Sequence, residues 1–209
     1  MALTDGIMLR PHALTGVRSW ARDRVTVLAG TPLRALNELL GERGLALANM
    51  GDITEQTVAG AIQTGTHGTG RDSGGLADQV AELELVLADG SVTTAVPGED
   101  LFDAARVGLG ALGVLTAVTL RVEPAFLLHN RRRRLPLSEM LGAIDSLTSA
   151  NEHLDFFWLP HTDACLVKTN NRNPGPARPP SAFKHWLDNV FLENTVFGAA
   201  CAVGARFPI

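Results

Sequence analysis

Residues 49–70, NMGDITEQTVAGAIQTGTHGTG, form the most informative segment of the sequence. Its 22 residues include five Gly, two Ala and five Thr, more small and hydroxylated side chains than a turn needs. Glycine lets a backbone approach a ligand closely, and threonine adds hydroxyl donors beside backbone N–H groups. Because the segment runs from a predicted strand end into a helix N-terminus, it predicts a cradle for an anion or a cofactor. A Gly-rich packing turn is the alternative.

Regular elements are predicted on the N-terminal side of this segment. Residues Arg24–Leu28 (RVTVL) contain three consecutive β-branched residues, which favours a strand. A helix is expected to follow, with Thr31 as its N-cap and Pro32 in its first position, and leucines then recur at helical spacing. Gly44 stands where a left-handed C-cap belongs.

The C-terminal side continues the alternation of helices and strands. Asp89-Gly90, between residues 80–87 and 92–96, predicts a β-hairpin because this dipeptide suits the turn that strand twist prefers. A short helix is expected over 99–107 and a strand over 114–122. The alternation of that strand predicts that four side chains share one face: Val114, Val118, Leu120 and Val122. The predicted fold class is therefore α+β, a mixed α/β unit.

Residues 108–113, GLGALG, match the G-x-G-x-x-G pattern of dinucleotide-binding folds. In those folds the loop follows a strand and opens a helix, so that the pyrophosphate meets the helix N-terminus. Here a predicted helix precedes the loop and a predicted strand follows it. The sequence therefore favours a tight helix-to-strand turn over a Rossmann site.

A change in charge divides the chain near Pro124. Residues 1–124 carry 9 basic and 15 acidic side chains, whereas residues 125–209 carry 9 basic and 7 acidic ones. We therefore predict two domains, 1–124 and 125–209.

The second predicted domain begins with four consecutive arginines, Arg131–Arg134, which are expected to form a solvated edge. An amphipathic helix is predicted over 137–147, and strands over 154–159 and 164–169. The last segment is helical in pattern, with one apolar side formed by Val196, Phe197, Ala200 and Val203.

Composition excludes several classes of protein. The chain has 209 residues, of which 45% are hydrophobic and 19% charged, and this excludes a disordered chain. Its net charge of −4 argues against bulk nucleic-acid binding. Two cysteines cannot form a disulfide framework, which favours a cytoplasmic location, with membrane association left open. No transmembrane segment is predicted, because the apolar stretch 191–209 is interrupted by polar residues and a proline.

The segment GDITEQTVAGAIQTGTHGTG resembles the second flavin-contacting segment of the vanillyl-alcohol-oxidase type FAD proteins, in particular the aldonolactone and alditol oxidases. The stretches LADQVAELELVLADGSV and LGALGVLTAVTLRVEP are similar to the rest of that flavin domain. LDFFWLPHTDACLVKTNNR is similar to the start of the family's substrate-side cap domain. The resemblance implies the second half of a PCMH-type FAD-binding domain (1–124), followed by a partial cap domain (125–209). It implies FAD as cofactor and a sugar lactone or polyol as substrate.

The same resemblance implies which residues line the flavin. They are Gly51, Asp52, Thr57, Gly60, Thr64, Gly65, Thr66, His67, Gly68 and the backbone of Val114. His67 is expected to act as an orienting hydrogen-bonding group, and no metal site is predicted because no second ligand stands at metal spacing. Asp52 is either a flavin-proximal residue or an Asx-type cap of the following turn. No catalytic residue is assigned.

The resemblance also indicates parts of the family that these residues do not contain. The family's pyrophosphate loop, with its Gly-His-Ser segment, and the His-Trp-Gly-Lys-like motif of the cap are not found in the sequence. We therefore expect an internal fragment of an FAD-dependent oxidoreductase, inactive by itself. Gly51, a small residue beside the flavin, favours oxygen as electron acceptor. The alternatives are a lactone dehydrogenase, an alditol oxidase, or a non-catalytic remnant that binds no flavin.

Overall fold

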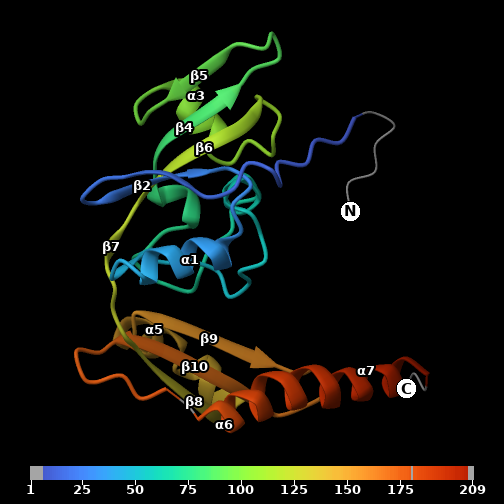
Figure 1. The fold of residues 1–209 in the computed structure, drawn as a ribbon. Coiled ribbons are helices and arrows are strands. Elements are labelled where there is room, and N and C mark those ends of the chain that lie inside the picture. The colour runs from blue at the N-terminus through green and yellow to red at the C-terminus, as the bar shows by residue number, and fades with distance from the viewer. Residues whose placement is uncertain (1–6, 180, 207–209) are drawn as a thin grey trace. The chain divides into compact units, whose positions relative to one another are not determined.

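The protein is described from a computed structural model, in which residues 7–179 and 181–206 are placed. It divides into two compact units, Met1–Asn173 and Pro174–Ile209. The first unit contains two separate main sheets, and the second is helical (Figure 1). The domain boundary predicted at Pro124 falls in a short strand within the first unit and stays a prediction.

A five-stranded antiparallel sheet forms the core of the first unit, with the order β1-β2-β6-β4-β5. The strands are β1 (Val17–Trp20), β2 (Arg24–Leu28), β4 (Val80–Val86), β5 (Val92–Ala95) and β6 (Val114–Arg121). The predicted hairpin is confirmed, since β4 pairs with β5 and Gly90 adopts a φ of +83°. Antiparallel pairing lets one face of this sheet be apolar and the other polar.

Three helices and one 3-10 turn bury the apolar face of the sheet. They are α1 (Leu33–Gly41), α2 (Val58–Gln63), η1 (Leu76–Gln79) and α3 (Asp100–Ala105). Leu33, Leu36 and Leu40 of α1 are fully buried in the same cluster as Val27 and Leu120 of the sheet. The leucine spacing predicted this packing, although α1 starts one residue later than expected, with Pro32 in the cap position. Gly44 has the predicted left-handed φ, +66°.

The predicted face of β6 is wrong at one position. Val118 and Leu120 are buried, but Val114 is 37% exposed, and its neighbour Leu115 is buried instead. The reason is a bulge, because Glu84 pairs with Ala117 while Leu85 pairs with Leu115. The extra residue, Thr116, shifts the alternation by one position. The loop 108–113 before this strand is the helix-to-strand turn that the sequence predicted, with Leu109, Gly110 and Gly113 at positive φ.

The cap sheet is a three-stranded antiparallel sheet with the order β8-β10-β9. Its strands are β8 (Leu128–Pro136), β9 (His153–Trp158) and β10 (Ala164–Arg172), and a two-stranded pair of β3 (Leu45–Ala46) with β7 (Glu123–Pro124) precedes it. Both strands predicted in this region are confirmed. The edge strand β8 was not predicted as a strand; it contains the four exposed arginines, so the predicted solvated edge is confirmed.

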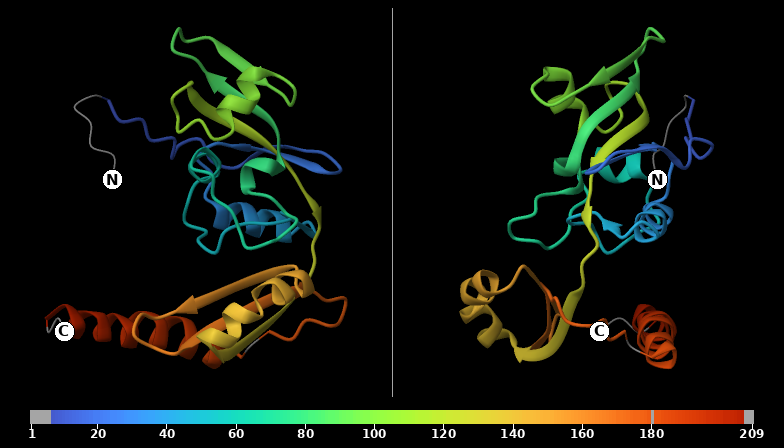
Figure 2. Two further views of the ribbon diagram at one scale, coloured as in Figure 1. Left: turned by 180° about the vertical axis from the view of Figure 1, so that it is seen from behind. Right: turned by 60° about the vertical axis from the view of Figure 1, so that its left-hand side comes forward.

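Two helices cover one face of the cap sheet (Figure 2), where Met140, Cys165 and Val167 form a small buried cluster. They are α4 (Leu137–Gly142) and α5 (Ile144–Ala150). The single helix predicted over 137–147 is wrong, because the chain breaks at Ala143, directly after Gly142. Glycine has a low helix propensity. As a result Leu141 and Ile144, expected on the apolar side, are 54% and 37% exposed.

The second unit consists of α6 (Ala182–Trp186), a π-helical segment η2 (Leu187–Val196) and α7 (Phe197–Arg206). Val196 and Val203, on the predicted apolar side, are exposed, whereas the side chains of Phe197 and Ala200 lie outside the described residues. None of the described helices is long and apolar enough to cross a membrane.

A charge pair on the polar face of the main sheet predicts an acid-sensitive contribution to stability. Arg18 donates to both carboxylate oxygens of Glu84 at 2.7 and 3.0 Å, and the Thr116 hydroxyl donates at 2.6 Å. The bonds from Arg18 first, and then that from Thr116, lower the pKa of Glu84. Its stabilising contribution is complete above the ordinary glutamate pKa of about 4.3 and is lost as the pH falls through the lower folded-state pKa.

We therefore expect Glu84→Gln to destabilise the protein by about 0.5–1 kcal/mol near neutral pH, because the pair is partly exposed. The difference from wild type should shrink as the pH falls from about 6 to about 3. Urea unfolding at a series of pH values measures it. A difference that grows on acidification would contradict the assignment.

Candidate functional site

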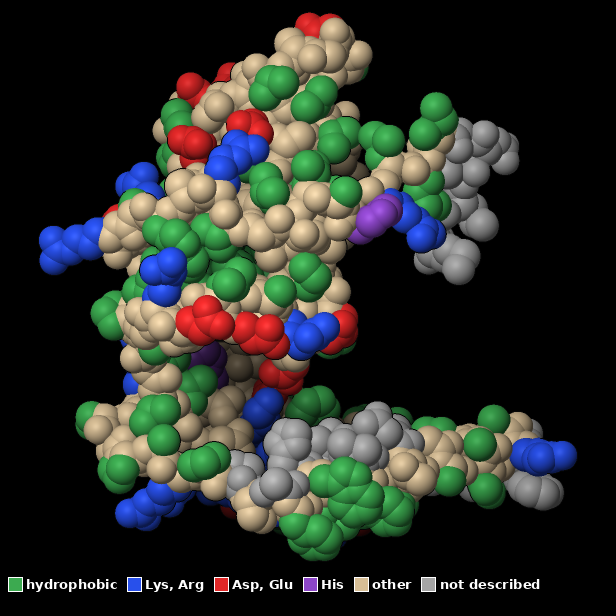
Figure 3. All heavy atoms as spheres, in the orientation of Figure 1, with side chains coloured by type: hydrophobic (Ala, Val, Ile, Leu, Met, Phe, Trp, Pro, Cys, Tyr) green, Lys and Arg blue, Asp and Glu red, His purple; other side chains and the backbone are tan. Residues whose placement is uncertain are grey.

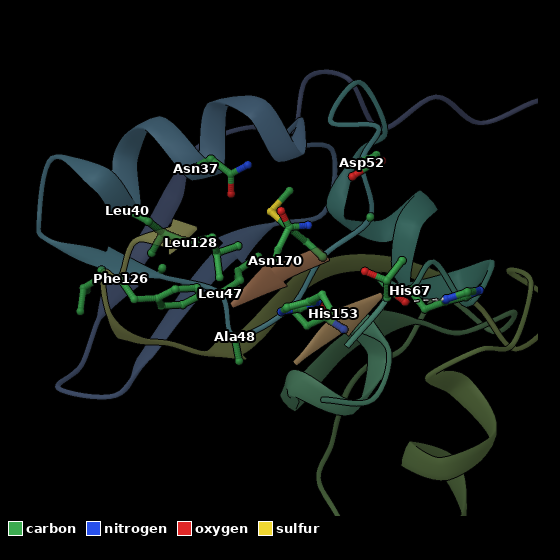
Figure 4. A pocket seen from close by; sticks show the side chains of 17 residues that line it. Asn37, Leu40, Leu47, Ala48, Asp52, His67, Phe126, Leu128, His153 and Asn170 are labelled. Atoms are coloured by element: carbon green, nitrogen blue, oxygen red, sulfur yellow. Dashed lines mark hydrogen bonds between the residues drawn. The ribbon is translucent and has the colours of Figure 1, made fainter. Parts of the chain in front are cut away.

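The two ends of the segment 49–70 meet at one cavity of about 650 Å³. Its polar side is lined by seven residues of the segment: Asn49, Met50, Gly51, Asp52, His67, Gly68 and Thr69. Figure 4 shows Asp52 and His67 on this side, with His153 and Asn170 of the cap sheet between them and the apolar side, where Leu40, Leu47, Phe126 and Leu128 gather. In Figure 3 a histidine is visible inside a hollow below a row of acidic side chains.

Two buried amide side chains fix the first limb of the loop 49–70, by which we mean residues 49–52; the second limb is residues 67–69. Gln79, at the end of η1, donates from Nε2 to the carbonyl of Asn49 at 2.5 Å and accepts from the N–H of Ala48 at 3.0 Å. Asn49 in turn donates from Nδ2 to the carbonyl of Gly74 at 3.0 Å. Because Gln79 and Asn49 are only 7% and 5% exposed, these bonds replace water for the backbone of the loop.

Two glycines let the limbs approach one another. A Cβ on Gly68 would lie 2.2 Å from Oδ1 of Asn49 and 2.5 Å from the carbonyl oxygen of Met50. A Cβ on Gly51 would lie 3.0 Å from Cγ2 of Thr66. Close packing therefore requires glycine at 68 and favours it at 51, in addition to any role that Gly51 has beside a flavin.

The middle of the segment folds away from this cavity. Thr57 caps α2 by accepting from the N–H of Gly60 at 3.1 Å, and the Thr64 hydroxyl donates to the carbonyl of Gly60 at 2.8 Å. The Thr66 hydroxyl is paired with Gln56. These hydroxyl groups are therefore used within the segment itself.

A second hollow, of about 320 Å³, is lined by some of the predicted flavin residues that do not line the larger cavity. Gly65, Thr66 and His67 line it together with Arg106, whose buried Nε has no hydrogen-bond partner among the described residues. The guanidinium pairs with Asp78 and Asp103 at 3.3 and 3.4 Å.

The structure thus brings together four of the predicted flavin residues at one cavity and two more at a neighbouring hollow. Gly51, Asp52, His67 and Gly68 line the larger cavity, and Gly65 and Thr66 line the smaller one, with His67 common to both. Thr57, Gly60, Thr64 and Val114 line neither. Contact of all ten with a flavin stays a prediction.

His67 and Asp52 have defined hydrogen-bond environments. Nδ1 of His67 lies 3.0 Å from the carbonyl oxygen of Gly68, so Nδ1 carries the proton of this bond, and Nε2 makes no hydrogen bond to the residues that the structure describes. Asp52 makes no capping bond to the following turn among the described residues; instead its Oδ2 lies 3.4 Å from Nζ of Lys168 on β10. No group of metal-ligating side chains occurs in the part of the chain that the structure describes.

Sequence reasoning missed the polar residues that the cap sheet contributes. Lys168 and Asp155 are cross-strand partners, as are Asn170 and His153. These polar residues alternate with Val167, Thr169 and other buried residues, and the sequence itself shows this two-residue period. What could not be read was which of the two faces turns toward the loop 49–70.

Comparisons with known proteins agree with this architecture. Residues 1–95 match the family described as FAD binding domain, and residues 118–209 match the family described as D-arabinono-1,4-lactone oxidase. The L-gulono-1,4-lactone dehydrogenase of Mycobacterium tuberculosis is 38% identical over 210 residues, covering 100% of this chain and 49% of that protein. The D-arabinono-1,4-lactone oxidase of Yarrowia lipolytica is 33% identical, covering 93% and 37%. The L-gulonolactone oxidase of Mus musculus is 37% identical, covering 90% and 43%.

A solved structure supports the fold. Cholesterol oxidase from B. sterolicum superposes with a TM-score of 0.75 over 91% of this chain and 41% of the oxidase, at 20% sequence identity. The chain spans about half the length, or less, of the relatives it matches. The superposition shows the fold alone, whereas the two family matches and the named relatives show that the chain belongs to the FAD-binding oxidoreductases of the aldonolactone oxidase group.

Proposed function

We propose that this chain forms the flavin-side wall and part of the substrate-side wall of an FAD-dependent oxidoreductase that acts on a sugar lactone or a polyol. The observation that carries the proposal is the cavity shared by the limbs of the loop 49–70 and by the cap sheet. Its volume lies within the range of small-molecule sites, about 300–1,000 Å³. The relatives named above act on lactones of this class, as their names state.

The residues at the cavity fit a flavin. Gly51 and Gly68 let the two ends of the loop pack closely against each other, so backbone forms this part of the cavity wall. The polar side offers backbone groups, small side chains, the Asp52 carboxylate and the His67 ring, which suit a hydrogen-bonding heterocycle. The apolar side, with Leu47 and Leu128, offers van der Waals contact. We assign Gly51, Asp52, Thr57, Gly60, Thr64, Gly65, Thr66, His67, Gly68 and the backbone of Val114 to the cofactor.

When bound, FAD accepts a hydride from the C–H of a CH–OH group and passes the electrons to oxygen or another acceptor. The chain's own residues hold the loop and the cavity wall in position around the cofactor. Gln79 and Asn49 fix the loop, Thr57 fixes the start of α2, and Lys168 holds Asp52 at the cavity wall. Gly51 leaves space beside the cofactor, which favours oxygen as acceptor. We assign no catalytic base within these residues.

The free cysteines Cys165 and Cys201 support a cytoplasmic location as part of the proposal.

We expect the 209-residue chain alone not to oxidise L-gulono- or D-arabinono-1,4-lactone, even with FAD added. The sequence contains no Gly-His-Ser segment, so part of the donor set for the pyrophosphate would have to come from another segment. Each missing charge-assisted bond would weaken binding by about 1.5–3 kcal/mol. The same residues, joined to the flanking segments of the M. tuberculosis relative, should bind FAD and oxidise a lactone.

Flavin absorbance and oxygen consumption of the two proteins test this proposal. A yellow, lactone-oxidising extended protein supports it. An extended protein that folds but binds no FAD would overturn it, and favour the non-catalytic remnant. Turnover by the isolated chain would show that the 209 residues already contain all parts that the chemistry requires.

A further inference from the structure

One face of the cap sheet carries four polar residues in a compact block: His153 and Asp155 on β9, and Lys168 and Asn170 on β10. We refer to these residues as the polar block. The pairs Asn170–His153 and Lys168–Asp155 face each other across the two strands. The residues that alternate with them on β10 (Cys165, Val167 and Thr169) are buried on the opposite face. The block therefore occupies the face that the helices α4 and α5 leave uncovered.

The polar block is attached to the loop 49–70 at two points. The backbones of Gly70 and His153 form a β-bridge, and a Cβ on Gly70 would lie 3.1 Å from Cε1 of the His153 ring. Nζ of Lys168 lies 3.4 Å from Asp52, at the other end of the cavity wall. The block is thus fixed beside the cavity and does not merely face solvent.

The charges of the block are unusually buried for a structural surface. The side chains of Lys168 and Asp155 are 18% and 17% exposed, and Oδ1 of Asp155 is buried with no hydrogen-bond partner among the described residues. Lys168 stands between two carboxylates, at 3.4 Å from Asp52 and 3.6 Å from Asp155. Arg132, the cross-strand partner of Lys168 on β8, adds a second cation to this face, so the two cations and the two carboxylates balance, which suits an uncharged ligand.

The two residues that line the cavity have free hydrogen-bonding groups. Asn130 donates to Oδ1 of Asn170 at 2.6 Å, which orients the amide and leaves its NH₂ group without a partner among the described residues. The His153 ring makes no side-chain hydrogen bond to the part of the chain that the structure describes, and a neutral imidazole offers one donor and one acceptor. Donors and an acceptor therefore stand side by side on adjacent strands.

We propose that His153 and Asn170 form a subsite for the hydroxyl groups of the uncharged lactone or polyol. This inference rests on the proposed function and names the residues that select its substrate class. Adjacent hydroxyl groups each donate and accept, which matches the mixed groups of this pair. The subsite thus distinguishes a hydroxylated ring from an unsubstituted one.

The test is an NMR titration of the 209-residue chain, which needs neither flavin nor turnover. L-gulono-1,4-lactone should shift the side-chain signals of Asn170 and His153. γ-Butyrolactone, which has the same five-membered lactone ring without hydroxyl groups, should bind at least about tenfold more weakly.

Two variants and a matched control assign the effect. Asn170→Asp keeps the acceptor for Asn130 but loses the NH₂ donor, and His153→Phe keeps an aromatic ring but loses both the donor and the acceptor. Each should raise the dissociation constant for L-gulono-1,4-lactone about three- to tenfold. His129→Phe, at an exposed position of β8, should leave it unchanged.

The outcomes separate this inference from the proposed function. Equal binding of γ-butyrolactone, no shift at the two residues, or wild-type affinity in both variants would overturn the subsite, even if the extended protein oxidises lactones. Hydroxyl-dependent binding that both variants weaken would support the subsite, even if no FAD binds and the oxidoreductase proposal fails.

Discussion

Replacement of Gly68 by alanine is expected to disrupt the cavity wall. The added methyl would lie 2.2 Å from Oδ1 of the buried Asn49 and 2.5 Å from the backbone of Met50, distances that real Cβ contacts do not show. Asn49 cannot simply turn away, because its amide is bonded to Gly74. We expect a loss of about 1–3 kcal/mol in the free energy of unfolding, the usual cost of overpacking. Displacement of Met50 should also weaken FAD binding by the extended protein more than tenfold.

Gly142→Ala provides the matched control. It adds the same methyl group where no atom lies within 4 Å, so stability should not fall. Urea unfolding gives the stability change, and quenching of flavin fluorescence gives the affinity. A Gly68→Ala protein with wild-type stability and affinity would show that the limbs of the loop part easily and that the wall is not rigid.

Replacement of Gln79 by leucine is expected to cost about 2–4 kcal/mol of stability. Leucine has a similar volume but bonds neither the N–H of Ala48 nor the carbonyl of Asn49, which Gln79 satisfies at 3.0 and 2.5 Å. Each buried backbone group left without a partner costs about 1–3 kcal/mol. The cost should appear first at the loop, because η1 and the core side chains around it keep their volume.

Amide hydrogen exchange locates this effect. The Ala48 amide should lose protection in Gln79→Leu, while the amides of the β4–β5 hairpin, such as Val86 and Val92, keep theirs. A loss of less than about 1 kcal/mol, or a uniform loss of protection, would contradict a local role for Gln79.

Elements that depend on only a few adjacent residues could be predicted from the sequence. Asp89-Gly90 set the hairpin and Gly44 set the end of α1, because both depend on the backbone conformation of one or two residues. The leucines of α1 defined its buried face. The segment 49–70 carried the resemblance to the FAD-binding family, which the family match over residues 1–95 supports, whereas its glycine and threonine content alone predicted only a cradle for a ligand.

Features that depend on pairing between distant strands could not be predicted from the sequence and were seen only in the tertiary structure. The bulge at Thr116 arises where β6 meets β4, and it moved Val114 off the buried face. The arginine run gave no apolar alternation, yet it forms β8 because its backbone pairs along the whole of β10.

The residues on the substrate side of the cavity also could not be predicted from the sequence. Asn170 and His153 are 17 positions apart in the sequence, and nothing in the order of the residues says that they are neighbours. The register of β9 against β10 joins them, and the buried cluster around Met140 decides which face of the sheet remains for the cavity. The local backbone conformation can be predicted from adjacent residues. The register of two strands and the face of a sheet that is buried depend on side chains from several segments at once.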